Sequence, residues 1–174
     1  MSRRNILSLL EGGDRRTIGR ADEVAAIVSD NPKFFSTLIA GLWSADPLVR
    51  MRAADAAEKV TRTHREFLRP YKKKLLGLMS EATEQELRWH LAVMIPRLLL
   101  NAEERQVAIS SLNRYLEDRS SIVKAFALQG LADLAQCEPS ILPRVVKLLL
   151  EATRSGTPAM KARSRKLLIR LKRA

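Results

Sequence analysis

Four segments of this chain repeat one arrangement of apolar and basic residues at intervals of 36 to 38 residues. They begin at Val49, Leu87, Val123 and Met160, and each opens with an apolar residue followed by Arg or Lys. Apolar or small residues, with Arg165 as the exception, recur four, five, seven, eight and eleven positions later, which is the spacing of one broad face of an α-helix. A regular interval of this length is typical of stacked helical repeats, each of which buries its apolar face against its neighbours.

Signals for helix starts stand in front of the repeated segments. Asp46-Pro47 and Thr157-Pro158 each combine a capping residue with a proline suited to the first helical position. The run 83–86 has the spacing of a capping box, and Asp118 or Ser120 is suited to cap the third helix. Apolar periodicity also predicts a second set of helices between the segments: Pro32–Trp43, Leu68–Ser80, Ala102–Leu116 and Ser140–Ala152.

The order of these residues resembles the HEAT-repeat family. Asp46, the apolar-basic pair Val49-Arg50 and the small pair Ala53-Ala54 carry the resemblance best, and the segment that begins at Val123 follows. The resemblance implies an all-α fold, a right-handed α-α superhelix (solenoid) of about 4.5 HEAT-like helix pairs. Because HEAT arrays serve many roles, the resemblance predicts fold more sharply than function.

This interpretation divides the chain into two parts. Residues 1–18 are expected to form an N-terminal arm or a short helix, and residues 19–174 a single HEAT-like repeat domain. Arg165 stands where the other segments have an apolar or small residue, so we expect that face of the last helix to look at solvent. Pro96 falls inside the second segment and should bend its helix. The expected repeats are 19–44, 46–80, 83–117 and 119–154, with a capping helix at 157–173.

The composition argues against several functional classes. A single cysteine, Cys137, rules out an internal disulfide and a Cys-rich zinc site. No stretch approaches the roughly 18 apolar residues of a membrane span, and we expect an intracellular, cytoplasmic protein. His64 and His90 lack the spacing of a metal site, and no Gly-rich phosphate loop is present. We therefore expect no cofactor, no metal and no catalytic activity.

The net charge of +12 favours anionic partners. The charge is uneven, because residues 157–174 carry seven bases and no acid, whereas residues 81–118 carry four bases and seven acids. The basic residue near the start of each repeated segment is expected to pair with an acid of a neighbouring repeat, such as Asp46 or Asp118. These four bases are Arg50, Arg88, Lys124 and Lys161.

Two basic surfaces are candidates for partner binding. The resemblance implies that the second helix of each pair lines a concave face, and we expect a basic stripe there. The last helix provides the other candidate, a C-terminal patch. The stripe comprises Arg69, Lys72, Lys73, Arg105, Arg144 and Lys147, and the patch comprises Lys161, Arg163, Arg165, Lys166 and Arg170.

Three functions remain open from the sequence. The first is a non-catalytic scaffold that holds a protein partner, and the second is a basic array that binds nucleic acid phosphates. Low aromatic content argues against stacking of single strands, so a duplex or structured RNA would be the nucleic acid. The third is an enzyme that resembles the HEAT-like DNA-alkylation glycosylases. A catalytic acid near Trp89 would be needed, and Glu84 and Glu86 are the nearest.

Overall fold

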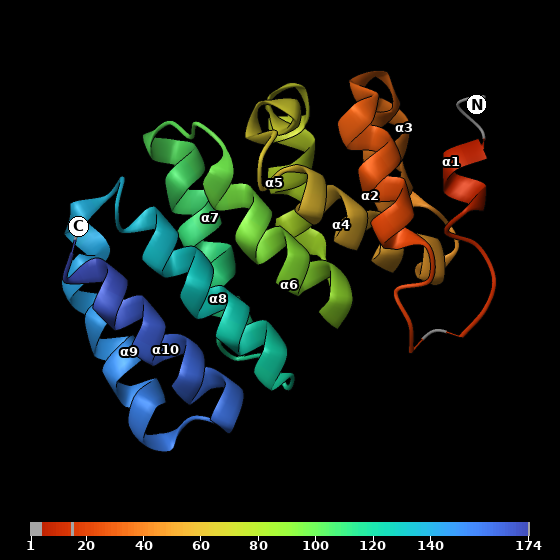
Figure 1. Cartoon of the computed structure of the whole chain (residues 1–174). Coiled ribbons are helices and arrows are strands. Elements are labelled where there is room, and N and C mark those ends of the chain that lie inside the picture. Colours follow the sequence, from red (N-terminus) through yellow and green to blue (C-terminus); the bar gives the residue numbers. More distant parts are fainter. Residues whose placement is uncertain (1–4, 15, 174) are drawn as a thin grey trace. The chain divides into compact units, whose positions relative to one another are not determined.

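The structure, a computed structural model, describes residues 5–14 and 16–173. Within these residues every regular element is a helix and no strand occurs, which confirms the all-α prediction. The chain divides into two compact units, residues 1–71 and 72–174. Figure 1 shows the order of the helices along the chain.

The first unit is built around α4 (Pro47–Val60), which packs against α2 (Ala21–Asp30) and α3 (Phe35–Ala40). Asp46 caps α4, as predicted, by accepting a hydrogen bond from the Leu48 N–H at 2.8 Å. The alanines of α4 are fully buried and allow its neighbours to approach closely. The other elements are α1 (Asn5–Ser8) and the 3₁₀ turns η1 (Pro32–Phe34), η2 (Gly41–Trp43) and η3 (Arg65–Tyr71).

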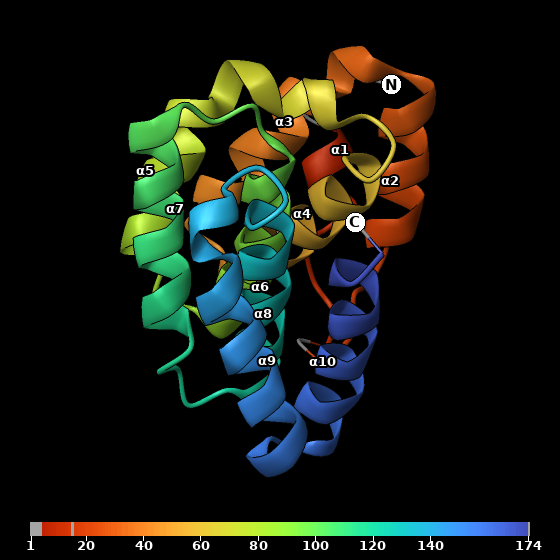
Figure 2. The ribbon, with the colours of Figure 1, turned by 90° about the vertical axis from the view of Figure 1, so that its left-hand side faces the viewer.

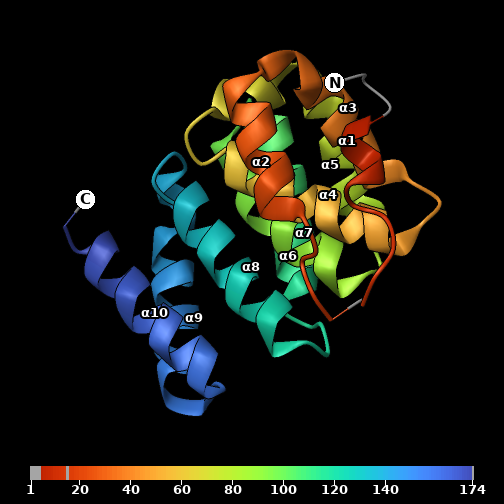
Figure 3. The same ribbon diagram turned by 45° about the vertical axis from the view of Figure 1, so that its right-hand side comes forward.

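A buried arginine on α4 holds the segment that joins α1 to α2. Arg52 is only 2% exposed, and its guanidinium donates to the backbone carbonyls of Leu10, Gly12 and Asp14 at 2.7–3.0 Å and of Thr17 at 3.3 Å. Figure 3 shows this segment running past α4. Because a charged donor is costly to bury without acceptors, these carbonyls compensate the burial of Arg52.

The second unit consists of three helix pairs. Its even-numbered helices α6, α8 and α10 pack side by side, and α5, α7 and α9 form the accompanying layer. Figure 2 shows α9 and α10 next to each other at the front. The helices are α5 (Lys72–Glu81), α6 (Gln85–Met94), α7 (Ala102–Tyr115), α8 (Ser121–Leu134), α9 (Leu142–Ser155) and α10 (Pro158–Leu171), with the 3₁₀ turns η4 (Ile95–Arg97) and η5 (Pro139–Ile141).

The capping predictions hold at α8 and α10 of this unit and fail at α6. Asn101 closes a capping box on α7, Ser120 caps α8 and Thr157 caps α10. The capping box predicted over 83–86 is wrong, because α6 begins one residue later than expected, with Glu84 at the N-cap position. The third residue of α6 is therefore Leu87, which has no carboxylate to return a hydrogen bond.

Pro96 ends a helix, where a bend within a continuous helix was expected. The α-helical part of the second repeated segment stops at Met94, and Pro96 lies in the 3₁₀ turn η4. Proline lacks the N–H that would continue the α-helical ladder, and its ring clashes with the carbonyl four residues earlier.

The basic residues that open the first two repeated segments make the same local contact in each unit. Arg50 donates to the carbonyl of Ser44, and Arg88 donates to the carbonyl of Ala82, six residues back in both cases. Arg88 also forms an ion pair with Asp118, which confirms the pairing with an acid of the next repeat at this position. One function of these bases is therefore to satisfy backbone carbonyls at the end of the preceding helix.

Candidate binding surface of the second unit

The charge of the second unit lies almost wholly in the α9–α10 pair. Residues 72–141 carry nine bases and nine acids and are therefore balanced. The pair itself, residues 142–173, has one acid, Glu151, against ten bases. These bases are Arg144, Lys147, Arg154, Lys161, Arg163, Arg165, Lys166, Arg170, Lys172 and Arg173.

Two residues of the predicted basic stripe form ion pairs between neighbouring helices. Lys72, the first residue of α5, contacts Glu104 of α7 with an Nζ–Oε2 distance of 2.7 Å. Arg105 of α7 contacts Glu138, just before η5, with an Nε–Oε2 distance of 3.1 Å. The hydrogen bond from Lys72, helped by the Asn101 N–H, lowers the pKa of Glu104. These two cations therefore join consecutive helix pairs.

The other four residues of the stripe are exposed. Arg69 belongs to η3 in the first unit, whereas Lys73 lies on α5 and both Arg144 and Lys147 lie on α9. None of the four forms a hydrogen bond or an ion pair with another described residue. Arg144 and Lys147, one turn apart, share the solvent face of α9.

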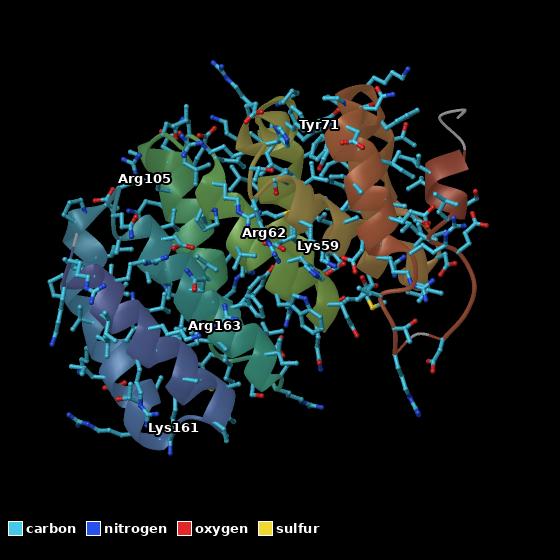
Figure 4. The ribbon with its side chains drawn as sticks, viewed as in Figure 1. Lys59, Arg62, Tyr71, Arg105, Lys161 and Arg163 are labelled. Carbon is cyan, nitrogen blue, oxygen red and sulfur yellow. The ribbon has the colours of Figure 1, made fainter. Side chains whose placement is uncertain are left out.

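The predicted C-terminal patch divides into a solvent-facing part and a packed part. Arg165 and Lys166 are exposed on α10, which confirms that this face looks at solvent, and Lys161 is half-buried. Arg163 and Arg170 instead turn toward α8 and are half-buried, and Figure 4 shows Arg163 where α10 lies against α8. The same helix therefore presents cations both to solvent and to the α8–α10 seam.

Each packed cation meets a residue of α8 that lies 37 positions earlier in the chain. The Arg163 guanidinium lies 3.9 Å from the centre of the Phe126 ring, and Arg170 Nη2 lies 2.6 Å from Asp133 Oδ1. Burial lowers the pKa of the Arg163 guanidinium, although the charge of Asp133 opposes this effect. Arginine nevertheless stays charged at neutral pH, so Arg163 is a partly dehydrated cation.

Exposed aliphatic side chains accompany these cations. Leu150 of α9 is 42% exposed, Ile169 of α10 is 52% exposed and Ile122 of α8 is 44% exposed. Ile122 lies one helical turn before Phe126 and so shares its ridge on α8. The candidate surface is therefore both basic and apolar.

A hollow of about 430 Å³ lies at the ends of α7, α8, α9 and α10. Its lining includes the cations Arg119 and Lys124 and the anions Glu117 and Glu151. The charges in its wall are thus balanced, and the excess charge of the unit does not accumulate there.

The buried histidine of this unit uses both ring nitrogens within the fold. His90 is buried; its Nδ1 lies 2.7 Å from the Glu86 carbonyl oxygen, and its Nε2 accepts from the Trp89 indole N–H at 3.1 Å. Both ring nitrogens are thus occupied. Cys137 is exposed, and within the described residues no group of three or more His, Cys, Asp or Glu side chains could hold a metal.

No protein-family model matches this sequence, and a comparison with curated proteins finds no match. Among the helices that the structure describes, none combines the length and the apolar character needed to span a membrane.

Sequence reasoning assigned Arg163 to the basic patch but missed its partner Phe126. Both residues occupy the fourth position of their repeated segments, which begin at Val123 and Met160. The repeat interval could therefore have predicted the contact between Phe126 and Arg163, since residues at the same position of consecutive repeats lie side by side when the repeats stack.

Proposed function

We propose that this chain is a non-catalytic binding scaffold whose second unit holds an acidic segment of a protein partner. The observation that carries this proposal is the segregation of charge, with ten bases and one acid in residues 142–173 and a balance in residues 72–141. An excess that is local, exposed and largely without carboxylate partners attracts anions and speeds their association. A single cysteine fits a reducing compartment, and we place this function in the cytoplasm.

The architecture proposed for this scaffold is a right-handed superhelix of about 4.5 HEAT-like helix pairs. Its support is the 36- to 38-residue interval in the sequence, together with side-chain contacts that span 37 residues between α8 and α10. The matching carbonyl contacts of Arg50 and Arg88 add an equivalence between the first and second segments.

The apolar residues of the surface favour a protein partner over a nucleic acid. Leu150 and Ile169 are exposed beside the cations of the α9–α10 pair, and residues 142–173 contain no aromatic side chain on which bases could stack. An acidic peptide with interspersed aliphatic residues would cover both the cations and the aliphatic side chains.

Nucleic acid phosphates are the second candidate ligand. Arg144, Lys147, Arg165 and Lys166 are exposed and have no ionic partner among the described residues, as phosphate contacts require. Duplex DNA or structured RNA would bind through these cations without reading bases.

The test compares three labelled probes by fluorescence anisotropy over a salt series: a peptide of glutamate and leucine, duplex DNA and a structured RNA. The proposal expects the peptide to bind most tightly at physiological salt, with affinity retained in part at high salt because apolar contacts are not screened. Tighter binding of DNA or RNA, with a steep salt dependence, would favour the second candidate.

A pair of charge-matched variants locates the surface. Reversal of four cations of the α9–α10 pair (R144E, K147E, R165E and K166E) should abolish peptide binding. Reversal of four exposed cations elsewhere (K33E, R65E, K73E and K74E) changes the net charge equally and should leave most of the affinity. Equal losses in both variants would show that the overall charge, and not this surface, attracts the probe.

A further inference from the structure

We infer that Arg163, held against Phe126, is the anchor that binds a carboxylate of an acidic segment of the partner. This inference rests on the proposed function, since it names the anchoring residue and the kind of segment for that surface. The surface it defines consists of Phe126 and Arg163 at the α8–α10 seam, together with the exposed Ile122 of α8 and the exposed Lys166 of α10.

Arg163 differs from the other half-buried arginines in the hydrogen bonding of its N–H donors. Among the described arginines that are half-buried, Arg163 alone has no hydrogen bond or ion pair with another described residue. Arg88, Arg105 and Arg170 each bond to a carboxylate. The Arg163 guanidinium carbon instead lies over the ring of Phe126, 3.9 Å from its centre. Stacking of this kind leaves the N–H groups in the plane of the guanidinium available to a planar oxyanion.

In the first unit, the guanidinium of an arginine at the same repeat position receives its acceptors from a non-helical loop of the chain. Arg52 and Arg163 both stand in the fourth position of their repeated segments, which begin at Val49 and Met160. Arg52 reaches back 35 to 42 residues to the chain between Leu10 and Thr17 and donates to four of its backbone carbonyls. A loop of the protein's own chain thus supplies the acceptors for one arginine at this repeat position.

The contact of Arg163 also spans 37 residues of the chain, but its partner is the aromatic ring of Phe126 and not a set of backbone carbonyls. Stacking orients the guanidinium but satisfies none of its N–H donors, and part of its hydration is already lost. A carboxylate at this position would therefore form charge-assisted hydrogen bonds at a reduced desolvation cost.

The surroundings of Arg163 define the chemistry of the segment. Lys166, one turn along α10, is exposed and adds a second cation, whereas Arg170 is already paired with Asp133. Ile122, on the same ridge as Phe126, offers an aliphatic contact. The occupant is therefore a segment in which an acidic residue that reaches Arg163 lies near an apolar residue that covers Ile122.

The experiment measures binding of the labelled glutamate–leucine peptide to the full chain and to single variants. R163K keeps the charge but lacks the planar fork, R163M removes the charge, and F126L removes the ring that orients the guanidinium. We expect R163K and R163M to lose at least tenfold in affinity and F126L about fivefold. The control R65M removes an exposed arginine of η3, outside the α9–α10 pair, and should lose less than threefold.

A direct readout accompanies these affinities. Addition of the peptide should shift the Nε–Hε resonance of Arg163 in the NMR spectrum of the wild-type chain, while the corresponding resonance of Arg65 in η3 moves little. Circular dichroism and thermal unfolding of each variant separate a loss of contact from a loss of fold. Should R163M fail to fold, the affinity of R163K and the Arg163 resonance of the wild-type chain still test whether Arg163 binds the carboxylate.

The two proposals fail in different ways. Wild-type affinity in R163K, together with an unmoved Arg163 resonance and a loss on reversal of the four α9–α10 cations, would overturn the anchor and leave the scaffold function standing. Absence of peptide binding by the wild-type chain would overturn both. A tenfold loss in R163K confined to duplex DNA would overturn the acidic segment as the occupant.

Discussion

Arg88 and Asp118 form an ion pair that joins α6 to the turn in front of α8. The Asp118 side chain is 5% exposed and accepts a second hydrogen bond from the Ser120 N–H at 2.8 Å. Arg88 also lies over the Tyr115 ring and donates to the Ala82 carbonyl. Arg88 of α6 thus contacts the end of α5 and the end of α7 as well as the turn in front of α8. Removal of its carboxylate partner should therefore destabilise this part of the unit.

The pH dependence of stability should report on Asp118. Burial raises the pKa of this carboxyl, but the hydrogen bonds from Ser120 and Arg88 outweigh it and the net pKa is lowered. A lowered pKa means that the stabilisation is complete above the unfolded value of about 3.9 and is lost as the pH falls through the folded value. Urea unfolding between pH 5 and pH 2 should therefore show a falling free energy of unfolding.

The variant D118N should flatten that acid limb and cost about 2 kcal/mol at pH 7, since a hydrogen bond to a charged group is lost. E81Q, which alters an exposed carboxylate at the end of α5, serves as the control. A wild-type acid limb in D118N would show that other carboxyls govern the pH dependence.

Gly130 permits the close contact between α8 and α6. A Cβ atom placed there would lie 2.3 Å from the Ala92 carbonyl oxygen, which belongs to the backbone of α6. G130A should therefore force the two helices apart and lower the free energy of unfolding by about 1–3 kcal/mol. Gly77 on α5 has open space around it, so G77A should instead raise stability by roughly 0.5–1 kcal/mol. If this packing is correct, chemical denaturation should show a lower free energy of unfolding for G130A and a higher one for G77A.

Arg52 should determine the order of the chain between α1 and α2. R52M removes every donor that the carbonyls of Leu10, Gly12, Asp14 and Thr17 receive from this guanidinium, and should destabilise the first unit by about 3 kcal/mol. Hydrogen exchange of the amides between residues 10 and 19 should accelerate far more than that of α8. R65M, at an exposed arginine of η3, is the control. Unchanged exchange in R52M would show that the segment is held by other contacts.

Gly19 should be intolerant of a side chain for the same reason. Its φ of 53° lies in the left-handed region, and a Cβ there would come within 2.6 Å of the Arg52 guanidinium. G19A is expected to reproduce the faster exchange of R52M, whereas G12A, with the same sign of φ but no atom within 4 Å, should cause only a backbone penalty of about 1 kcal/mol.

Tyr115 anchors α7 to α5 through a buried hydrogen bond. Its hydroxyl donates to the Met79 carbonyl at 2.7 Å, and burial raises the pKa of the phenol. Y115F should cost about 1 kcal/mol in urea unfolding, and the phenol should stay un-ionised until the protein unfolds in alkali. Ionisation at the pH of a free tyrosine, followed by ultraviolet absorbance, would contradict this contact.

Local sequence rules predicted the helices well and the contacts between helices poorly. Asp46 and Thr157 were predicted as caps, and Ser120 as one of two candidates beside Asp118, because capping depends on residues within one turn. The box over 83–86 failed because a shift of one residue in the start of α6 changes which residue occupies its third position. Lys72 and Arg105 were assigned to a binding stripe, but their partners lie 32 and 33 residues away and could not be selected from sequence.

The sequence by itself determined that this chain is helical, where several of its helices begin, and that its charge excess accumulates near the C-terminus. Those properties follow from periodicity, capping and composition, which act over a few residues or over the whole chain. Only the tertiary structure decided which cations contact other residues of the fold and which are exposed and available to a partner. Arg52 meets backbone carbonyls, Arg88 meets Asp118 and Arg163 meets the Phe126 ring, because the fate of a side chain depends on what packing places beside it.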